Sequence, residues 1–96
     1  MSYKDEYHPR VKKDLKKLDK GVVREIYDKH LENILQEPYR GEELHGDLVG
    51  VSSYHFRINN VDYRIAYSIE EVRNIVYFLM VGKRENFYEL LRRRLR

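Results

Sequence analysis

One short stretch of the sequence, residues 53–67, gathers side chains that suit the binding of a phosphate group. Its apolar and aromatic residues alternate with polar ones, which predicts a β-hairpin whose apolar side chains share one buried face. The outward face would then carry His55, Arg57, Asp62 and Arg64. Arginine holds a phosphate through two parallel N–H bonds, and histidine titrates near neutral pH. The spacing therefore predicts a phosphate site on this outward face.

A two-residue turn at Asn59-Asn60 would decide which of these side chains meet. With that turn, His55 lies directly across from Arg64. The same register sets Arg57 across from Asp62, and an exposed ion pair of that kind is worth only ~0–1 kcal/mol. A histidine on the polar face of a strand is often simply solvated, so the pairing alone does not assign it a role.

Length and composition narrow the class of protein. The 96 residues predict one domain, 1–96, and 42% hydrophobic residues are ordinary for a globular chain. Cysteine is absent, and no apolar stretch is long enough to span a membrane. The charged start does not resemble a signal peptide, so we expect a cytoplasmic protein without a membrane partner. A net charge of +3 is too small to identify a nucleic-acid binder by itself.

The elements that must position the hairpin follow from local patterns. A strand is expected at residues 2–7, a helix opening at His8-Pro9, a second helix at about 22–36 and a loop at 38–50. Further strands are expected at about 52–59, 61–69 and 74–81, and a final short helix is capped by Asn86 with Glu89 three residues on. The fold class is therefore α+β in the order β-α-α-β-β-β-α. We expect a small antiparallel sheet with a helical hairpin on one face and a short C-terminal helix.

Four segments, in this order and spacing, resemble the RelE/ParE superfamily of bacterial and archaeal toxins. They are Lys12–Asp19, Glu43–Leu48, Val61–Tyr67 and Val81–Arg84, and the likeness covers nearly the whole chain. The resemblance implies a toxin of a type II toxin–antitoxin system that is neutralised by a small antitoxin wrapping around it.

The resemblance also implies where a site would lie. RelE-like members cut messenger RNA in the ribosomal A site, whereas ParE-like members poison DNA gyrase and lack the cationic site. The RelE-like positions align here with His55, Arg57, Arg64, Arg84 and Tyr88. The first two stand where the best-known relative has lysines.

These five residues suit RNA cleavage in which the ribose 2′-OH is the nucleophile. His55 suits the base, and flanking Arg57 and Arg64 would lower its pKa and keep it neutral. The same two arginines suit the phosphate, Arg84 suits a further clamp, and Tyr88 suits base stacking or proton sharing. Because no carboxylate and histidine residues have metal-ligand spacing, we expect a metal-free route without a cofactor.

The sequence favours a RelE-like endoribonuclease whose partners are a RelB-like antitoxin, the ribosome and messenger RNA. Toxin and antitoxin together could form a heterotetramer. Ribosome dependence is expected because the site is short of conventional acid–base groups. Three alternatives stay open: a ParE-like gyrase poison, an inactive relative that acts as a binding module, and a ribosome-independent ribonuclease.

Overall fold

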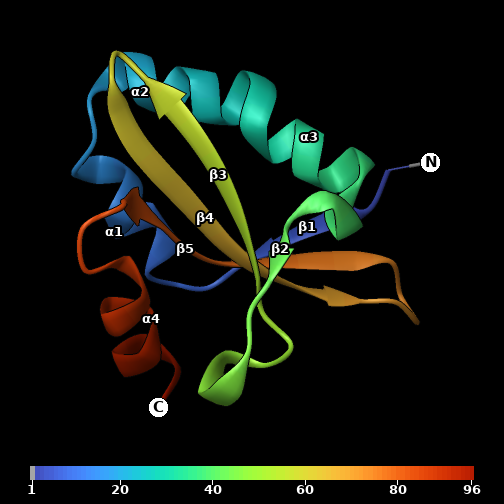
Figure 1. Cartoon of the computed structure of the whole chain (residues 1–96). Coiled ribbons are helices and arrows are strands. Elements are labelled where there is room, and N and C mark those ends of the chain that lie inside the picture. The colour runs from blue at the N-terminus through green and yellow to red at the C-terminus, as the bar shows by residue number, and fades with distance from the viewer. Residues whose placement is uncertain (1) are drawn as a thin grey trace.

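A computed structural model describes residues 2–96 and shows a five-stranded sheet covered by helices (Figure 1). The α+β class and the order of the long elements agree with the prediction from sequence. The elements are β1 (Lys4–Tyr7), α1 (Val11–Lys16), α2 (Lys20–Glu25), a π-helical turn (Ile26–His30), α3 (Leu31–Gln36), β2 (Glu42–Glu43), β3 (Ser52–Ile58), β4 (Val61–Glu70), β5 (Ile75–Lys83) and α4 (Phe87–Leu95).

The strands lie in the order β1-β5-β4-β3-β2, and two details of this sheet differ from expectation. First, β1 runs parallel to β5, so the sheet is mixed and the expected fully antiparallel pairing is wrong at this edge. Parallel pairing needs a long crossover, and everything from α1 to β4 lies between these two strands. Second, the segment expected to be a loop at 38–50 contains β2, which pairs with β3, and two short 3-10 helices, Pro38–Arg40 and Gly46–Leu48.

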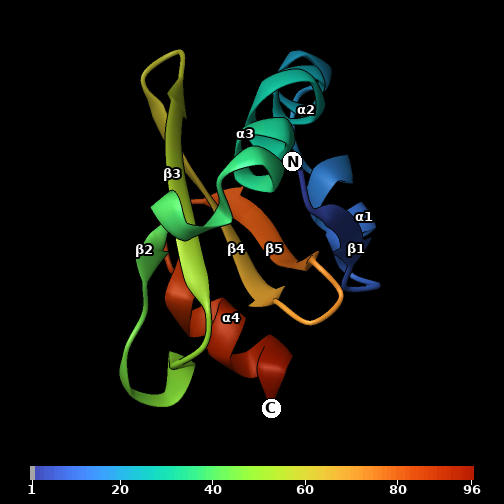
Figure 2. The ribbon, with the colours of Figure 1, turned by 90° about the vertical axis from the view of Figure 1, so that its right-hand side faces the viewer.

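Two clusters of buried side chains cover the two faces of the sheet. One lies between α1–α3 and the sheet and includes Ile26, Phe56 and Phe78. The other lies under α4 and includes Met80 and Phe87. Figure 2 shows α2 and α3 beside β3, with α4 well separated from them. The outward face of the β3–β4 hairpin is therefore on the side of the sheet that α4 covers.

The start of α4 does not use the expected capping box. Asn86 has a left-handed backbone with φ of 57°, and its side chain makes no capping hydrogen bond. Glu89 instead lies 3.4 Å from Arg93, one turn along the helix. The left-handed residue turns the chain sharply after β5. Because no side-chain cap holds the start of α4, the position of the helix depends on packing by Phe87 and Leu91, which are almost fully buried.

A buried ion pair also fixes α4. Both guanidinium Nη atoms of Arg94 lie 2.7 Å from the carboxylate oxygens of Asp14 in α1. The same carboxylate accepts the Val81 amide at 3.0 Å, and Arg94 also donates to the Leu79 carbonyl at 2.9 Å. One bidentate pair thus joins α4, α1 and β5. No helix within residues 2–96 is long and apolar enough to cross a membrane.

Candidate functional site

The β3–β4 hairpin has the register that the sequence predicts. Asn59 and Asn60 both have positive φ, 50° and 66°, as the two central residues of a tight hairpin turn require. His55 pairs with Arg64, and Arg57 pairs with Asp62. These side chains therefore leave the same face of the sheet from directly opposed positions.

The other face of the hairpin anchors it to the helical layer. The Phe56 ring stacks on Tyr63 at a centroid distance of 5.3 Å and on buried His30 at 4.0 Å. The two ring nitrogens of His30 lie 2.8 Å from the Tyr54 hydroxyl and 2.9 Å from the Glu25 carboxylate. The strand that carries His55 is thus supported from beneath by a packed and hydrogen-bonded layer.

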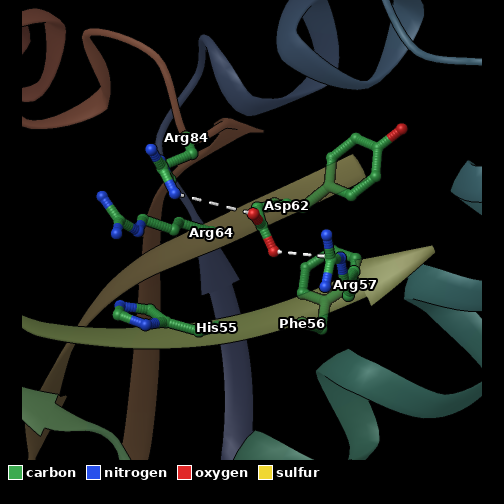
Figure 3. Close-up of a pocket in the computed structure, with 7 residues that line it drawn as sticks. His55, Phe56, Arg57, Asp62, Arg64 and Arg84 are labelled. Atoms are coloured by element: carbon green, nitrogen blue, oxygen red, sulfur yellow. Dashed lines mark ion pairs between the residues drawn. The ribbon is translucent and has the colours of Figure 1, made fainter. Parts of the chain in front are cut away.

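Between the hairpin and the end of β5 lies an open depression of about 340 Å³ (Figure 3). Three arginines line it, and the Asp62 carboxylate lies between two of them, 3.6 Å from Arg57 and 3.7 Å from Arg84. All three paired side chains are about half exposed or more. Exposed pairs of this kind are worth about 0–1 kcal/mol, so an incoming phosphate can replace the carboxylate at small cost.

Arg64 contacts an aromatic ring, whereas Arg57 and Arg84 are paired with a carboxylate. Its guanidinium lies over the Tyr88 ring, 4.9 Å from the centroid, and no carboxylate within residues 2–96 forms an ion pair with it. Its opposite residue on β5 is Gly82, which has no side chain to crowd that guanidinium. Arg64 is therefore held by an aromatic face while its charge stays available to an anion.

His55 lies next to this arginine, in contact with three side-chain oxygens. Its Nε2 atom is 3.1 Å from the Ser53 hydroxyl, 3.3 Å from the Tyr88 hydroxyl and 3.4 Å from the Glu42 carboxylate. The Tyr88 hydroxyl also donates to Ser53 at 3.2 Å. The C-terminal helix, the hairpin and the short strand β2 therefore converge on one imidazole.

Comparison with known proteins decides the family. The sequence profile of the ParE-like toxins of type II bacterial toxin–antitoxin systems matches residues 6–92. The chain belongs to this toxin family. The resemblance to the RelE/ParE superfamily is thereby confirmed. Among proteins with curated descriptions, none matches the chain in sequence.

Solved structures of RelE toxins share the toxin fold. The toxin–antitoxin complex RelBE2 from Mycobacterium tuberculosis matches with a TM-score of 0.78 and 25% identity, covering 88% of this chain and 100% of that one. An arginine-to-alanine double mutant of E. coli RelE, bound to a RelB peptide, matches with a TM-score of 0.70 and 26% identity over 94% and 95% of the two chains. The archaeal RelE–RelB complex from Pyrococcus horikoshii gives a TM-score of 0.58 at 24% identity, over 88% and 98%.

The proton affinity of His55 in this toxin is set by its surroundings. Burial lowers the pKa of His55 most, and the charge of Arg64 lowers it further, while Glu42 and Asp62 act to raise it. The direction agrees with the expectation from sequence, but burial comes first and Arg57 is not among the causes. The imidazole is therefore mainly neutral at pH 7 and able to accept a proton.

All five residues expected in the toxin's site lie on one side of the sheet, although they fall into two groups. Arg57 and Arg84 lie near the hairpin turn with Asp62, whereas His55 and Arg64 both contact Tyr88 in the first turn of α4. Within residues 2–96, no group of three histidine, aspartate or glutamate side chains is arranged to hold a metal ion.

Two further residues at this site, Ser53 and Glu42, were missed from the sequence. Ser53 continues the outward series 53, 55, 57, so the strand alternation could have revealed it. Glu42 had no such signal, because its segment was expected to be a loop and β2 is only two residues long.

Proposed function

We propose that this toxin is a metal-free endoribonuclease that cuts messenger RNA in the ribosomal A site, so that translation stops. The observation that supports the proposal most directly is the cluster of His55, Arg64 and Tyr88. It combines a neutral imidazole with a cation that has no carboxylate partner, and both contact one phenol: the Tyr88 hydroxyl lies 3.3 Å from His55 and the Tyr88 ring centroid lies 4.9 Å from the Arg64 guanidinium. A neutral base beside an available cation is what attack on a phosphodiester needs.

In the proposed reaction, His55 removes the proton from the ribose 2′-OH and the 2′-oxygen attacks phosphorus. Arg64 stabilises the negative charge that develops on the phosphoryl oxygens, with Arg57 and Arg84 binding the neighbouring backbone. The bond from phosphorus to the 5′-oxygen then breaks, which leaves a 2′,3′-cyclic phosphate. Tyr88, whose hydroxyl contacts His55, is the group that we propose gives a proton to the leaving 5′-oxygen.

The proposal includes the ribosome and an antitoxin as partners. The depression is open, and Arg57 and Arg84 on its rim are exposed, so the site by itself does little to bend RNA into the in-line geometry that the attack needs. A ribosome that presents the bent A-site codon would supply that geometry. A RelB-like antitoxin is proposed because the RelE structures from M. tuberculosis and P. horikoshii contain RelB partners.

Substitution of Arg64 tests the proposal. We expect Arg64→Ala to reduce A-site cleavage by roughly 10²–10³-fold, the usual cost of removing one charge-stabilising donor. The matched control is Arg73→Ala, which removes an exposed arginine paired with Glu70 on the far end of the β4–β5 hairpin. The measurement is mapping of messenger-RNA 5′ ends in a translation extract, beside the same RNA without ribosomes. Equal cleavage by the Arg64 variant and the wild type would refute the assignment.

A ParE-like gyrase poison is the second candidate, because the matching family profile is that of ParE-like toxins. A gyrase poison does not need the imidazole and the arginine cluster for chemistry. It should leave messenger RNA intact, cause DNA breaks and remain toxic as Arg64→Ala. RNA and DNA integrity, measured in the same induced cells, separates the two activities.

A further inference from the structure

Three side-chain oxygens surround Nε2 of His55, and those of Glu42 and Ser53 bear on which ring nitrogen carries the proton. The Glu42 carboxylate lies 3.4 Å from Nε2 as an ion-pair contact, and a carboxylate anion has no hydrogen to donate to that nitrogen. A lone pair on Nε2 would face that negative charge, whereas an N–H would be attracted to it. The Ser53 hydroxyl at 3.1 Å offers the same N–H a second acceptor.

We infer that Glu42 and Ser53 are positioning residues that hold His55 as the Nε2–H tautomer and leave Nδ1 as the atom that accepts the substrate proton. No side chain within residues 2–96 is hydrogen-bonded to Nδ1. The catalytic consequence rests on the proposed nuclease function, but the state of the imidazole does not.

The backbone holds both positioning residues against the imidazole. Glu42 is paired with Ser53 in the β2–β3 ladder, so its side chain leaves the sheet beside that of Ser53. Gly41, just before it, packs so closely on Tyr67 that a Cβ there would overlap the hydroxyl. The Tyr67 hydroxyl donates a hydrogen bond to the Pro38 carbonyl at 2.6 Å, so the segment that precedes β2 is bonded to the sheet.

Ser53 also couples the tautomer to α4. Ser53 is almost completely buried, with 1% of the residue exposed, and its hydroxyl oxygen accepts a hydrogen bond from the Tyr88 hydroxyl of α4. A single buried hydroxyl therefore aligns the proposed base with the phenol that shares its site. Besides these groups, the charges that face His55 are those of Arg64 and Asp62 on β4.

The test is the state of the ring nitrogens by NMR on ¹⁵N-histidine-labelled protein without RNA. We expect Nε2 of His55 to give a protonated signal and Nδ1 an unprotonated one at neutral pH. Glu42→Gln should shift the population toward the other tautomer, because an amide can donate to Nε2, and should lower the pKa of His55. Glu43→Gln is the matched control, since the neighbouring carboxylate lines a different pocket. A protonated Nδ1 in the wild type, or no change in Glu42→Gln, would overturn the inference.

Single-turnover cleavage adds a second readout. Ser53→Ala should lower the rate constant of the cleavage step by roughly 10–100-fold, no more than a general base contributes. KM, measured separately at steady state, should stay unchanged. Ser52→Ala controls for loss of a hydroxyl from the same strand. If Ser53→Ala does not fold, the exposed Glu42→Gln variant still decides the question. A toxin with the expected tautomer but no RNA cleavage would remove the proposed function and leave the tautomer assignment standing.

Discussion

Removal of the Asp14 carboxylate should destabilise this toxin far more than any surface substitution. The Asp14 and Arg94 side chains are only 9% and 11% exposed, and loss of one partner leaves the other charge buried and unpaired. That change costs about 3–5 kcal/mol. The Val81 amide also loses its hydrogen-bond acceptor, and an unpaired buried donor costs about 1–3 kcal/mol. Part of this cost is already included in the figure of about 3–5 kcal/mol for the broken ion pair. Since domains of this size are stable by only about 5–15 kcal/mol, Asp14→Ala removes a large fraction of the total.

Urea unfolding followed by circular dichroism measures the effect. The midpoint should fall with an unchanged m value, and Tm should fall by more than about 12 °C, at roughly 4–8 °C per kcal/mol. Arg93→Ala is the matched control, because it breaks an exposed pair on the same helix and should change stability by less than about 0.5 kcal/mol. A loss of under 1 kcal/mol in Asp14→Ala would refute the argument that this pair holds α4 in place.

Three further predictions concern His55 and the residues that lead into β2. The single-turnover cleavage rate should rise with pH to a plateau, with a midpoint below about 6.5, because burial and Arg64 lower the pKa of His55. For the same reason the free energy of unfolding should fall as pH drops below about 6.5, and His55→Gln should reduce that slope while the contribution of His8, whose pKa is also lowered, persists. Gly41→Ala should cost about 1–3 kcal/mol in urea unfolding through overlap with Tyr67, and a fully stable variant would contradict the close packing there.

The sequence predicted the hairpin correctly because its signals are local. Strand alternation and a two-residue Asn-Asn turn determine the register by themselves, and both were read from adjacent residues. The parallel pairing of β1 with β5 depends on where the chain returns after all the elements from α1 to β4. No local pattern carries that information, which is why this edge of the sheet was predicted wrongly.

The same distinction applies to the site. His55, Arg57 and Arg64 follow from the alternation of one hairpin, whereas Arg84 and Tyr88 were expected only through the family resemblance. Glu42 could not be found by either route. Its position depends on a two-residue strand, which in turn depends on the absence of a side chain at Gly41 and on the hydroxyl of a distant strand. Tertiary contacts of this kind are not encoded in a local period.

The geometry of the site is joined to the stability of the fold through α4. One face of this helix buries Phe87 and Leu91, its last turn carries Arg94 into the pair with Asp14, and its first turn brings Tyr88 to the imidazole. A change that weakens the docking of α4 therefore also loosens the contacts of Tyr88 with Arg64 and His55, although none of these groups has been altered. Asp14→Ala, some distance along the chain from the site, should thus lower cleavage as well as stability. Because the two losses share one cause, they should appear at the same temperature as the protein is warmed.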